Sequence, residues 1–271
     1  ILKLTPDVKL LVTSREALNL QEEWFHPLTG LSLPASPSAS ADGTGKNNTA
    51  DAVQLFVQNA RRASVTFSLE AEARQVARIC RLVDGIPLAL ELAATWLKVL
   101  SCAQIADEIE HGLDILTTRQ QNIPARHRSM RAVLEQAWQL LDGPEQNVLQ
   151  QLALLRGSFS QAAAGQVANA SLPVLAALVE KAFIYQSAGR YQMHELLRQF
   201  AAEQLAHRPD QARETETRHS CYYLNFLQTC PDIKQIDPDL ENIRAGWRFA
   251  VAHDHFVWLQ AAADALYHYY T

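Results

Sequence analysis

His194 and Glu195 begin the stretch of this sequence that comes nearest to a metal-dependent hydrolase pattern, H-E-L-L-R. In zinc proteases with H-E-x-x-H, two imidazoles one helical turn apart hold the metal and the glutamate acts as a general base. Arg198 stands here where the second imidazole is needed, and a guanidinium group cannot ligate zinc. The other close histidine pair, His253 and His255, lacks a third ligand. We therefore predict no metal site on this chain.

Gly43, Gly45 and Lys46 resemble only part of a phosphate-binding loop. Such a loop needs G-x-x-x-x-G-K-[ST], because backbone N–H groups and the lysine surround the phosphates while the hydroxyl holds magnesium. Ser40 occupies the first glycine position and Asn47 the hydroxyl position. The sequence also has no G-x-S-x-G nucleophile elbow. We expect no catalytic residue, and we do not expect the chain to be an enzyme.

Residues 84–94, D-G-I-P-L-A-L-E-L-A-A, combine a glycine turn with the start of an apolar helix. Gly85 can adopt backbone angles that are closed to other residues, and Pro87 has its φ preset for a first helical position, where its missing N–H is not needed. The residues that follow leave only a narrow polar stripe, so the helix is predicted to be mostly buried. On these residues alone the stretch is typical of a well-capped core helix.

The composition is that of a globular protein of two to four domains, with 271 residues, 48% hydrophobic and 20% charged. No run of residues is apolar enough for a membrane span. A net charge of −5 argues against a surface dedicated to nucleic acid. The four cysteines have no C-x-x-C spacing, which favours free thiols and a cytoplasmic location.

Hydrophobic periodicity divides the chain into segments that must position these residues. Val8–Val12 is predicted to be a buried strand, and residues 34–49, rich in Pro, Ser, Gly and Asn, a flexible linker. The helical pattern of residues 50–122 predicts a small bundle. Residues 123–207 show helices, then a hairpin pattern, then another helix, which indicates a winged helix. Residues 208–271 are predicted to be helical and to begin a repeat array.

Several segments together resemble the STAND class of signal transduction ATPases, which includes NB-ARC proteins and bacterial transcriptional regulators of LuxR/SARP type. The matching segments, in chain order, are Val8–Arg15 (the sensor strand ending in T-[TS]-R), Asp51–Phe56 (the opening of the helical domain), Asp84–Leu88 (the G-x-P motif), Tyr191–Arg198 (the M-H-D motif, with Glu195 in place of aspartate) and Glu241–Ala245 (the helix that opens the repeats).

This resemblance implies a mainly α fold. Residues 1–33 would be the end of a nucleotide-binding α/β domain with a vestigial strand, and 34–49 the linker. Residues 50–122 would form a helical lid (ARC1-like), 123–207 a winged-helix (ARC2-like) domain with a small β-hairpin, and 208–271 the start of a TPR-like sensor. Because the chain begins at Ile1 without methionine, we expect a fragment whose P-loop lies upstream.

The resemblance also implies a binding site for ADP or ATP, with magnesium in the intact parent and with weak or no binding by this fragment alone. Arg15 would reach toward the terminal phosphate, Gly85 would shape the loop, Pro87 would pack against adenine, and His194 would donate to the diphosphate. Further implied partners are the missing ATPase domain, other copies of the chain on activation, and an inducer or protein on the C-terminal repeats.

The function implied by the resemblance is the regulatory portion of a nucleotide-dependent switch, in which lid and winged helix clamp ADP in the off state. Two alternatives remain: a DNA-binding winged-helix regulator and a helical scaffold for protein interactions. Residues 173–181, the candidate recognition helix, carry one basic residue, Lys181, at their end. Base reading needs more polar and basic groups than this, so DNA binding by this part is not expected.

Overall fold

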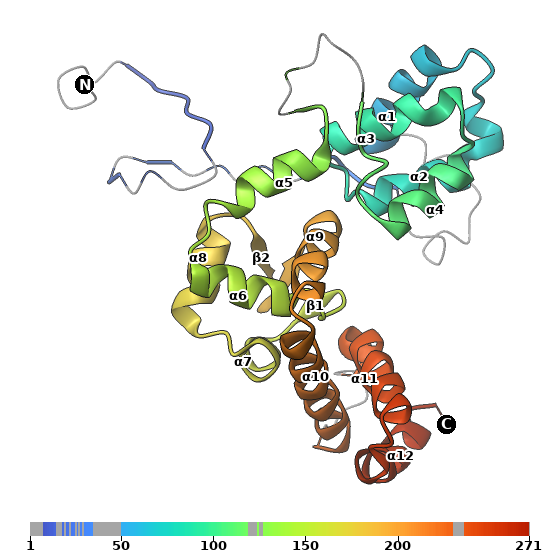
Figure 1. Cartoon of the computed structure of the whole chain (residues 1–271). Helices are drawn as coiled ribbons and strands as arrows, with labels where there is room; N and C mark the ends of the chain where they lie inside the picture. Colours follow the sequence, from blue (N-terminus) through green and yellow to red (C-terminus); the bar gives the residue numbers. More distant parts are fainter. Residues whose placement is uncertain are drawn as a thin grey trace.

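The computed structural model describes residues 8–14, 18, 20–21, 23–24, 26, 28, 30–34, 50–118, 124, 127–229 and 236–270, with the side chains of 264, 266 and 268–270 left out. Within these ranges it contains twelve α-helices and one three-stranded antiparallel sheet, which confirms the predicted mainly α fold (Figure 1). None of the described helices is by itself long and apolar enough to cross a membrane; α7 and α8 pass that test jointly but are bent by 109°.

The first four helices form a bundle, here named the lid: α1 (Asp51–Ala63), α2 (Leu69–Leu82), α3 (Pro87–Thr95) and α4 (Cys102–His111). Helix α1 packs on α3, and α2 packs on α4. Phe56 and Ile79 are fully buried between these helices, together with most of α3. The apolar face of α3 is therefore a core surface, as its sequence predicts.

The middle of the chain has the order of elements of a winged helix. After α5 (Met130–Trp138), the elements are α6 (Gly143–Leu152), β1 (Ser158–Phe159), α7 (Gln161–Ala168), α8 (Leu172–Glu180), β2 (Ile184–Ser187), β3 (Arg190–Met193) and α9 (Glu195–Ala206). The strands lie in the order β1-β3-β2, with Phe159 opposite Tyr191 and Tyr185 opposite Gln192. The hairpin is where the sequence predicts it, whereas β1 is too short to show a periodic pattern.

Three helices follow: α10 (Pro209–Thr229), α11 (Leu240–Ala252) and α12 (Phe256–Tyr270). In Figure 1 they extend from the winged helix on the side opposite the lid. Helices α10 and α11 cross closely at Gly246, where an added Cβ would lie 3.1 Å from the Cα of Ser220. The Ser220 hydroxyl donates to the Gly246 carbonyl at 2.7 Å, which fixes this crossing.

The predicted strand at Val8–Val12 is wrong. Residues 8–14 have no regular secondary structure, and Leu11 is 99% exposed. A strand needs a neighbouring strand to satisfy its backbone N–H and C=O groups, and within the described residues none lies beside this segment. Of the predicted linker, residues 35–49 lie outside the described residues.

Candidate functional site

The turn after α2 has the geometry that its sequence predicts. Asp84 and Gly85 both have positive φ, 48° and 68°. The Gly85 N–H donates to the Cys80 carbonyl at 3.0 Å, and the Asp84 N–H donates to the Arg81 carbonyl at 3.1 Å. These two bonds form a Schellman motif, which satisfies the last carbonyl groups of a helix. The left-handed turn directs the chain into α3.

A second segment of backbone lies against this turn. The Leu31 N–H donates to the Gly85 carbonyl at 2.9 Å. A Cβ on Gly85 would lie 2.4 Å from the Leu31 oxygen, and a Cβ on Gly30 would lie 2.3 Å from the Asp84 oxygen. Both distances are far below van der Waals contact, so two glycines are required where these backbones meet. The segment that precedes α1 is thereby fixed to the turn.

Pro87 is the first residue of α3, and its ring is exposed. It lines a shallow hollow of about 550 Å³ between α1 and α3. The remaining lining residues combine an apolar floor with polar and acidic groups: Leu31, Asp51, Gln54, Leu55, Gln58 and Glu91. This is a surface on which a flat, uncharged ring could pack. His194 is not part of its lining.

His194 is the N-cap of α9, and its Nδ1 accepts a hydrogen bond from the Leu196 N–H at 3.2 Å. In the neutral imidazole the proton therefore resides on Nε2. This nitrogen is buried and has no hydrogen-bond partner among the described residues. The nearest acid is Asp84, whose Oδ2 lies 3.6 Å away. The structure thus brings His194 to the Asp84-Gly85 turn, three positions before Pro87.

The electrostatics of this contact favour a neutral imidazole. Burial lowers the pKa of His194 below its ordinary value of 6.5, although the charges of Asp84 and Glu195 act in the opposite direction. The phenol of Tyr185, on β2, has a raised pKa because it is partly buried and feels the charge of Asp84. Of these two groups, the imidazole lies beside the carboxylate of Asp84, at 3.6 Å. Sequence reasoning missed Asp84 and Tyr185, and only the Asp-Gly pair gave a signal.

Helix α9 makes two further polar contacts with the lid side. The Gln199 side chain donates to the Ile109 carbonyl at 3.3 Å. Arg131 forms ion pairs with Glu203 on α9 at 2.6 Å and with Asp114 at 2.8 Å. Together with His194–Asp84, these contacts constitute what we name the lid junction.

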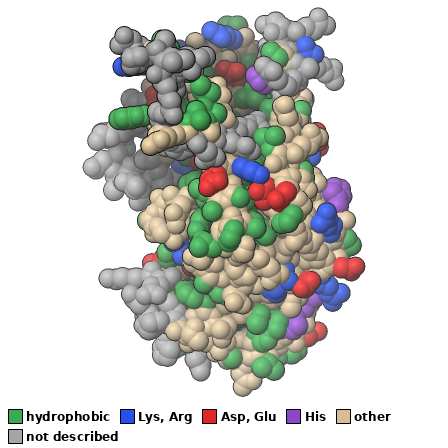
Figure 2. Space-filling view, turned by 90° about the vertical axis from the view of Figure 1, so that its left-hand side faces the viewer, with side chains coloured by type: hydrophobic (Ala, Val, Ile, Leu, Met, Phe, Trp, Pro, Cys, Tyr) green, Lys and Arg blue, Asp and Glu red, His purple; other side chains and the backbone are tan. Residues whose placement is uncertain are grey.

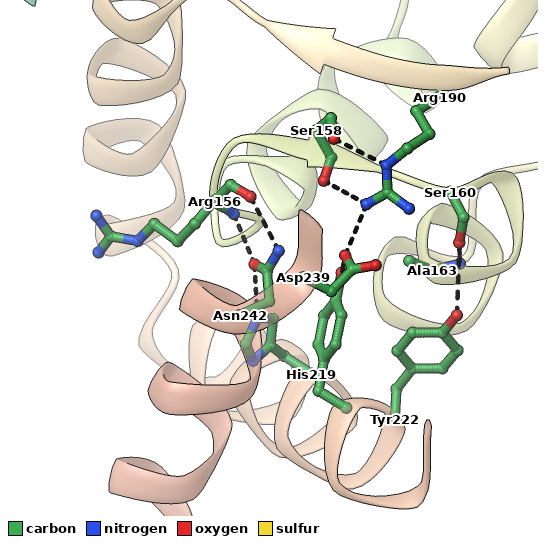
Figure 3. Close-up of polar contacts among 10 residues, drawn as sticks. Arg156, Ser158, Ser160, Ala163, Arg190, His219, Tyr222, Asp239 and Asn242 are labelled. Carbon is green, nitrogen blue, oxygen red and sulfur yellow. Dashed lines mark hydrogen bonds and ion pairs between the residues drawn. The ribbon is translucent and has the colours of Figure 1, made fainter. Parts of the chain in front are cut away.

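On its other side the winged helix is joined to α11, in what we name the C-terminal junction (Figure 3). Arg190 donates to the Ser158 hydroxyl and carbonyl and to Asp239, each at 2.8 Å. Asn242 accepts from the Arg156 N–H at 2.7 Å and donates to the Arg156 carbonyl at 2.9 Å. The buried side-chain amide of Asn242 thus satisfies both backbone groups of Arg156. Arg156 lies in a loop, where no regular secondary structure supplies these hydrogen bonds.

The candidate recognition helix α8 has no basic group on its exposed face. Leu172, Pro173, Ala176 and Glu180 are exposed there. Lys181, which follows the helix, lies 2.7 and 2.9 Å from the two carboxylate oxygens of the buried Glu145. Figure 2 views the side on which α8 lies and shows hydrophobic side chains gathered in the middle of the face, with no broad basic patch.

The predicted site residues have different outcomes. Gly85 and Pro87 lie on one turn and helix start, and His194 contacts that turn through Asp84. Arg15 lies outside the described residues. Within the described part of the chain, no group of three or more His, Cys, Asp or Glu side chains could hold a metal ion.

Comparison with known proteins gives relatives along most of the chain. A Mycobacterium tuberculosis (strain H37Rv) protein named "Putative HTH-type transcriptional regulator" is 27% identical over 96% of this chain and 30% of its own length, as is a Mycobacterium bovis counterpart. An "Uncharacterized protein" of M. tuberculosis is 32% identical over 76% of this chain and 52% of its own length. The chain spans about a third of the first two relatives. A comparison of the chain with models of protein families found no match.

Proposed function

We propose that this chain is a regulatory part of a transcription regulator, in which the winged helix joins the lid to the C-terminal helices and does not read DNA. The names of the relatives at 27% identity support the first half of this proposal. The claim that the winged helix does not read DNA rests on one observation: its basic side chains form ion pairs within the chain. Both basic residues flanking α8 and the hairpin, Lys181 and Arg190, are committed to Glu145 and Asp239.

A DNA-reading winged helix lays its recognition helix in the major groove and contacts phosphates with Lys and Arg. The exposed face of α8 offers alkyl groups and one carboxylate. A carboxylate near phosphates is repelled, and alkyl groups discriminate bases poorly. This composition suits contact with protein instead.

Duplex DNA binding by the whole chain tests this assignment. We expect fluorescence anisotropy at low salt to show no binding beyond a weak level that is equal for unrelated sequences. Tight binding that weakens with salt, and that is lost in Lys181→Gln or Arg190→Gln but not in the lid variant Arg62→Gln, would make the winged helix a DNA reader.

As a finer proposal, we infer that the nucleotide ADP controls the lid junction. Two observations support it. The buried Nε2–H of His194 lacks a hydrogen-bond acceptor within the described residues, and an anion such as a phosphate would supply one. The exposed Pro87 ring, beside Leu31 and Leu55, offers an apolar surface for a purine. The two groups flank the same turn, and His194 does not line the hollow beside Pro87.

Titration with fluorescent ADP tests this finer proposal. His194→Ala and Pro87→Ala should each weaken binding by about tenfold, the effect of losing one charge-assisted hydrogen bond or one packed ring. Pro173→Ala is a matched control, because Pro173 is also an exposed proline in the first turn of a helix, α8. Equal affinities in all four proteins would exclude nucleotide control at this junction.

A further inference from the structure

The N-cap of α9 is a side chain of the type that changes charge near neutral pH. His194 holds this position, and its Nδ1 accepts a hydrogen bond from the Leu196 N–H at 3.2 Å. An imidazole accepts a hydrogen bond only through a nitrogen that carries no proton. The cap of α9 therefore exists only while His194 is neutral. By contrast, the N-cap of α7, Ser160, accepts through a hydroxyl oxygen, which does not titrate in this range.

The second ring nitrogen of His194 faces the lid. Nε2 is shielded from solvent, and within the described residues it has no hydrogen-bond partner. The nearest acid is Asp84 of the lid, 3.6 Å away. One ring thus joins two elements, because Nδ1 caps α9 while Nε2 lies against the turn between α2 and α3. Since the ring is rigid, a rotation that breaks the bond to Leu196 also moves Nε2 relative to Asp84.

Two carboxylates favour protonation of His194: Asp84 on the turn and Glu195 on α9. The charge of Glu195 is already compensated by Arg198, which donates to both of its oxygens at 2.8 and 2.6 Å. Strand β2 contributes Tyr185, which feels the charge of Asp84; its pKa is raised, so the phenol stays neutral in this pH range. Asp84 is therefore the main attraction for an imidazolium at this position.

Three effects oppose protonation of His194. A proton on Nδ1 would face the Leu196 N–H, so that two donors meet and the cap is lost. The added charge would lie at the N-terminus of α9, where the helix dipole is also positive. Burial disfavours the charged ring, and it is the largest influence on the His194 pKa, which lies below 6.5. A hydrated imidazole in an open junction keeps its ordinary pKa, so binding of a proton favours the open state.

We propose that His194 is an acid-sensitive latch, which holds the lid against the winged helix while it is neutral and releases the lid when it is protonated. The ion pairs elsewhere in the lid junction involve no imidazole, because Arg131 pairs there with Glu203 and Asp114. Release is therefore confined to the end of the junction at Asp84. The latch requires neither nucleotide nor DNA, so it goes beyond the proposed function.

Hydrogen exchange of the whole chain, without nucleotide, at about pH 7.5 and about pH 5 tests the latch. Protection factors, corrected for the intrinsic effect of pH, report the cap bond at the Leu196 amide. We expect this protection to fall by about fivefold or more at the lower pH, the factor that loss of one N-cap gives. The Ala163 amide, which Ser160 caps at 3.1 Å, is the matched control and should change by less than about twofold. Global unfolding would affect both amides alike.

His194→Asn separates the charge from the cap, because asparagine is a favoured N-cap residue that does not titrate. The Leu196 amide in this variant should be equally protected at both pH values, whereas in His194→Ala it should be weakly protected at both. Small-angle X-ray scattering should show a larger radius of gyration at about pH 5 for the wild type and no change for His194→Asn. Circular dichroism checks that each variant is folded.

Any of four results would overturn the latch: unchanged protection of Leu196 in the wild type, an equal loss at Ala163, an acid response that persists in His194→Asn, or an unchanged radius of gyration. Titration with fluorescent ADP of Pro87→Ala tests the nucleotide proposal separately, because Pro87 takes no part in the latch. Failure of the latch is thus distinguishable from failure of ADP control.

Discussion

The Nε2 atom of His194 lies 3.6 Å from the carboxylate of Asp84, across the boundary between the winged helix and the lid. The resemblance to signalling ATPases predicts an anion beside this imidazole, and here the chain itself supplies one. The distance is slightly longer than a hydrogen bond, so the buried N–H is attracted to Asp84 without being satisfied by it. The contact can therefore yield to a better acceptor.

Replacing the carboxylate should change the titration of His194. In the wild type we expect the imidazole pKa to lie below 6.5, because burial outweighs the charges of Asp84 and Glu195. In Asp84→Asn the pKa should fall further, since one charge that raises it is removed. Titration of the imidazole proton signals by NMR measures both values. Glu91→Gln, on α3, should leave the His194 pKa unchanged; a rise in Asp84→Asn would contradict the contact.

Gly85→Ala should destabilise the protein strongly. The substitution places a Cβ 2.4 Å from the Leu31 oxygen at a residue with φ of 68°. We expect the free energy of unfolding to fall by at least about 2 kcal/mol, from backbone strain and from displacement of the Leu31 segment. Chemical denaturation measures this. Gly143→Ala is the control, because an added Cβ there meets nothing within 4 Å; equal stabilities would disprove the close approach.

His219, between α10 and α11, should make stability depend on pH. It is 5% exposed, and burial lowers its pKa from 6.5 to about 4. Below pH 6.5 the unfolded chain binds more protons than the folded one, so stability falls as the pH drops from about 6.5 to about 4. This group's share is about 3 kcal/mol. His219→Gln should show a flatter pH profile in denaturant titrations, whereas the exposed His111→Gln should keep the wild-type slope.

Asn242→Ala should loosen the C-terminal junction. It leaves the N–H and the carbonyl of Arg156 without their partner, and the free energy of unfolding should fall by about 2–3 kcal/mol. Hydrogen exchange at the Arg156 amide should become faster. In the described part of the chain, the Asn59 amide donates to the Leu55 carbonyl of its own helix, so Asn59→Ala should change stability by less than about 0.5 kcal/mol. Slow exchange retained in Asn242→Ala would refute the clamp.

Much of the fold could be predicted from the sequence, because several turns and helix starts are specified by residues close together in the chain. The turn at Gly85, the proline starts of α3, α6 and α8, and the hairpin around Gly189 are each specified by residues close in the chain. The strand predicted at Val8–Val12 failed because an apolar run of this length specifies a strand only beside another strand. Whether a neighbouring strand is present depends on the tertiary structure, and a local sequence pattern does not report it.

The site was predictable only in part. Proline and glycine reveal their backbone role by type, so Gly85 and Pro87 could be placed on one turn. The approach of Asp84 to His194 depends on how the lid packs against the winged helix, and no periodic pattern encodes that packing. The roles of Lys181 and Arg190 were likewise hidden, because a basic residue looks the same in sequence whether it faces solvent or a buried carboxylate.

The paired glycines Gly30 and Gly85 have a mechanical consequence. With no side chains between them, the backbone ahead of α1 lies directly against the turn ahead of α3 and is hydrogen-bonded to it, so a displacement of one segment should displace the other together with Asp84. A pull on residues 30–32 is therefore transmitted to the acid that faces His194 without first unfolding α1. Tension applied at the N-terminal side of the lid would therefore change the distance between Asp84 and His194, at the boundary with the winged helix.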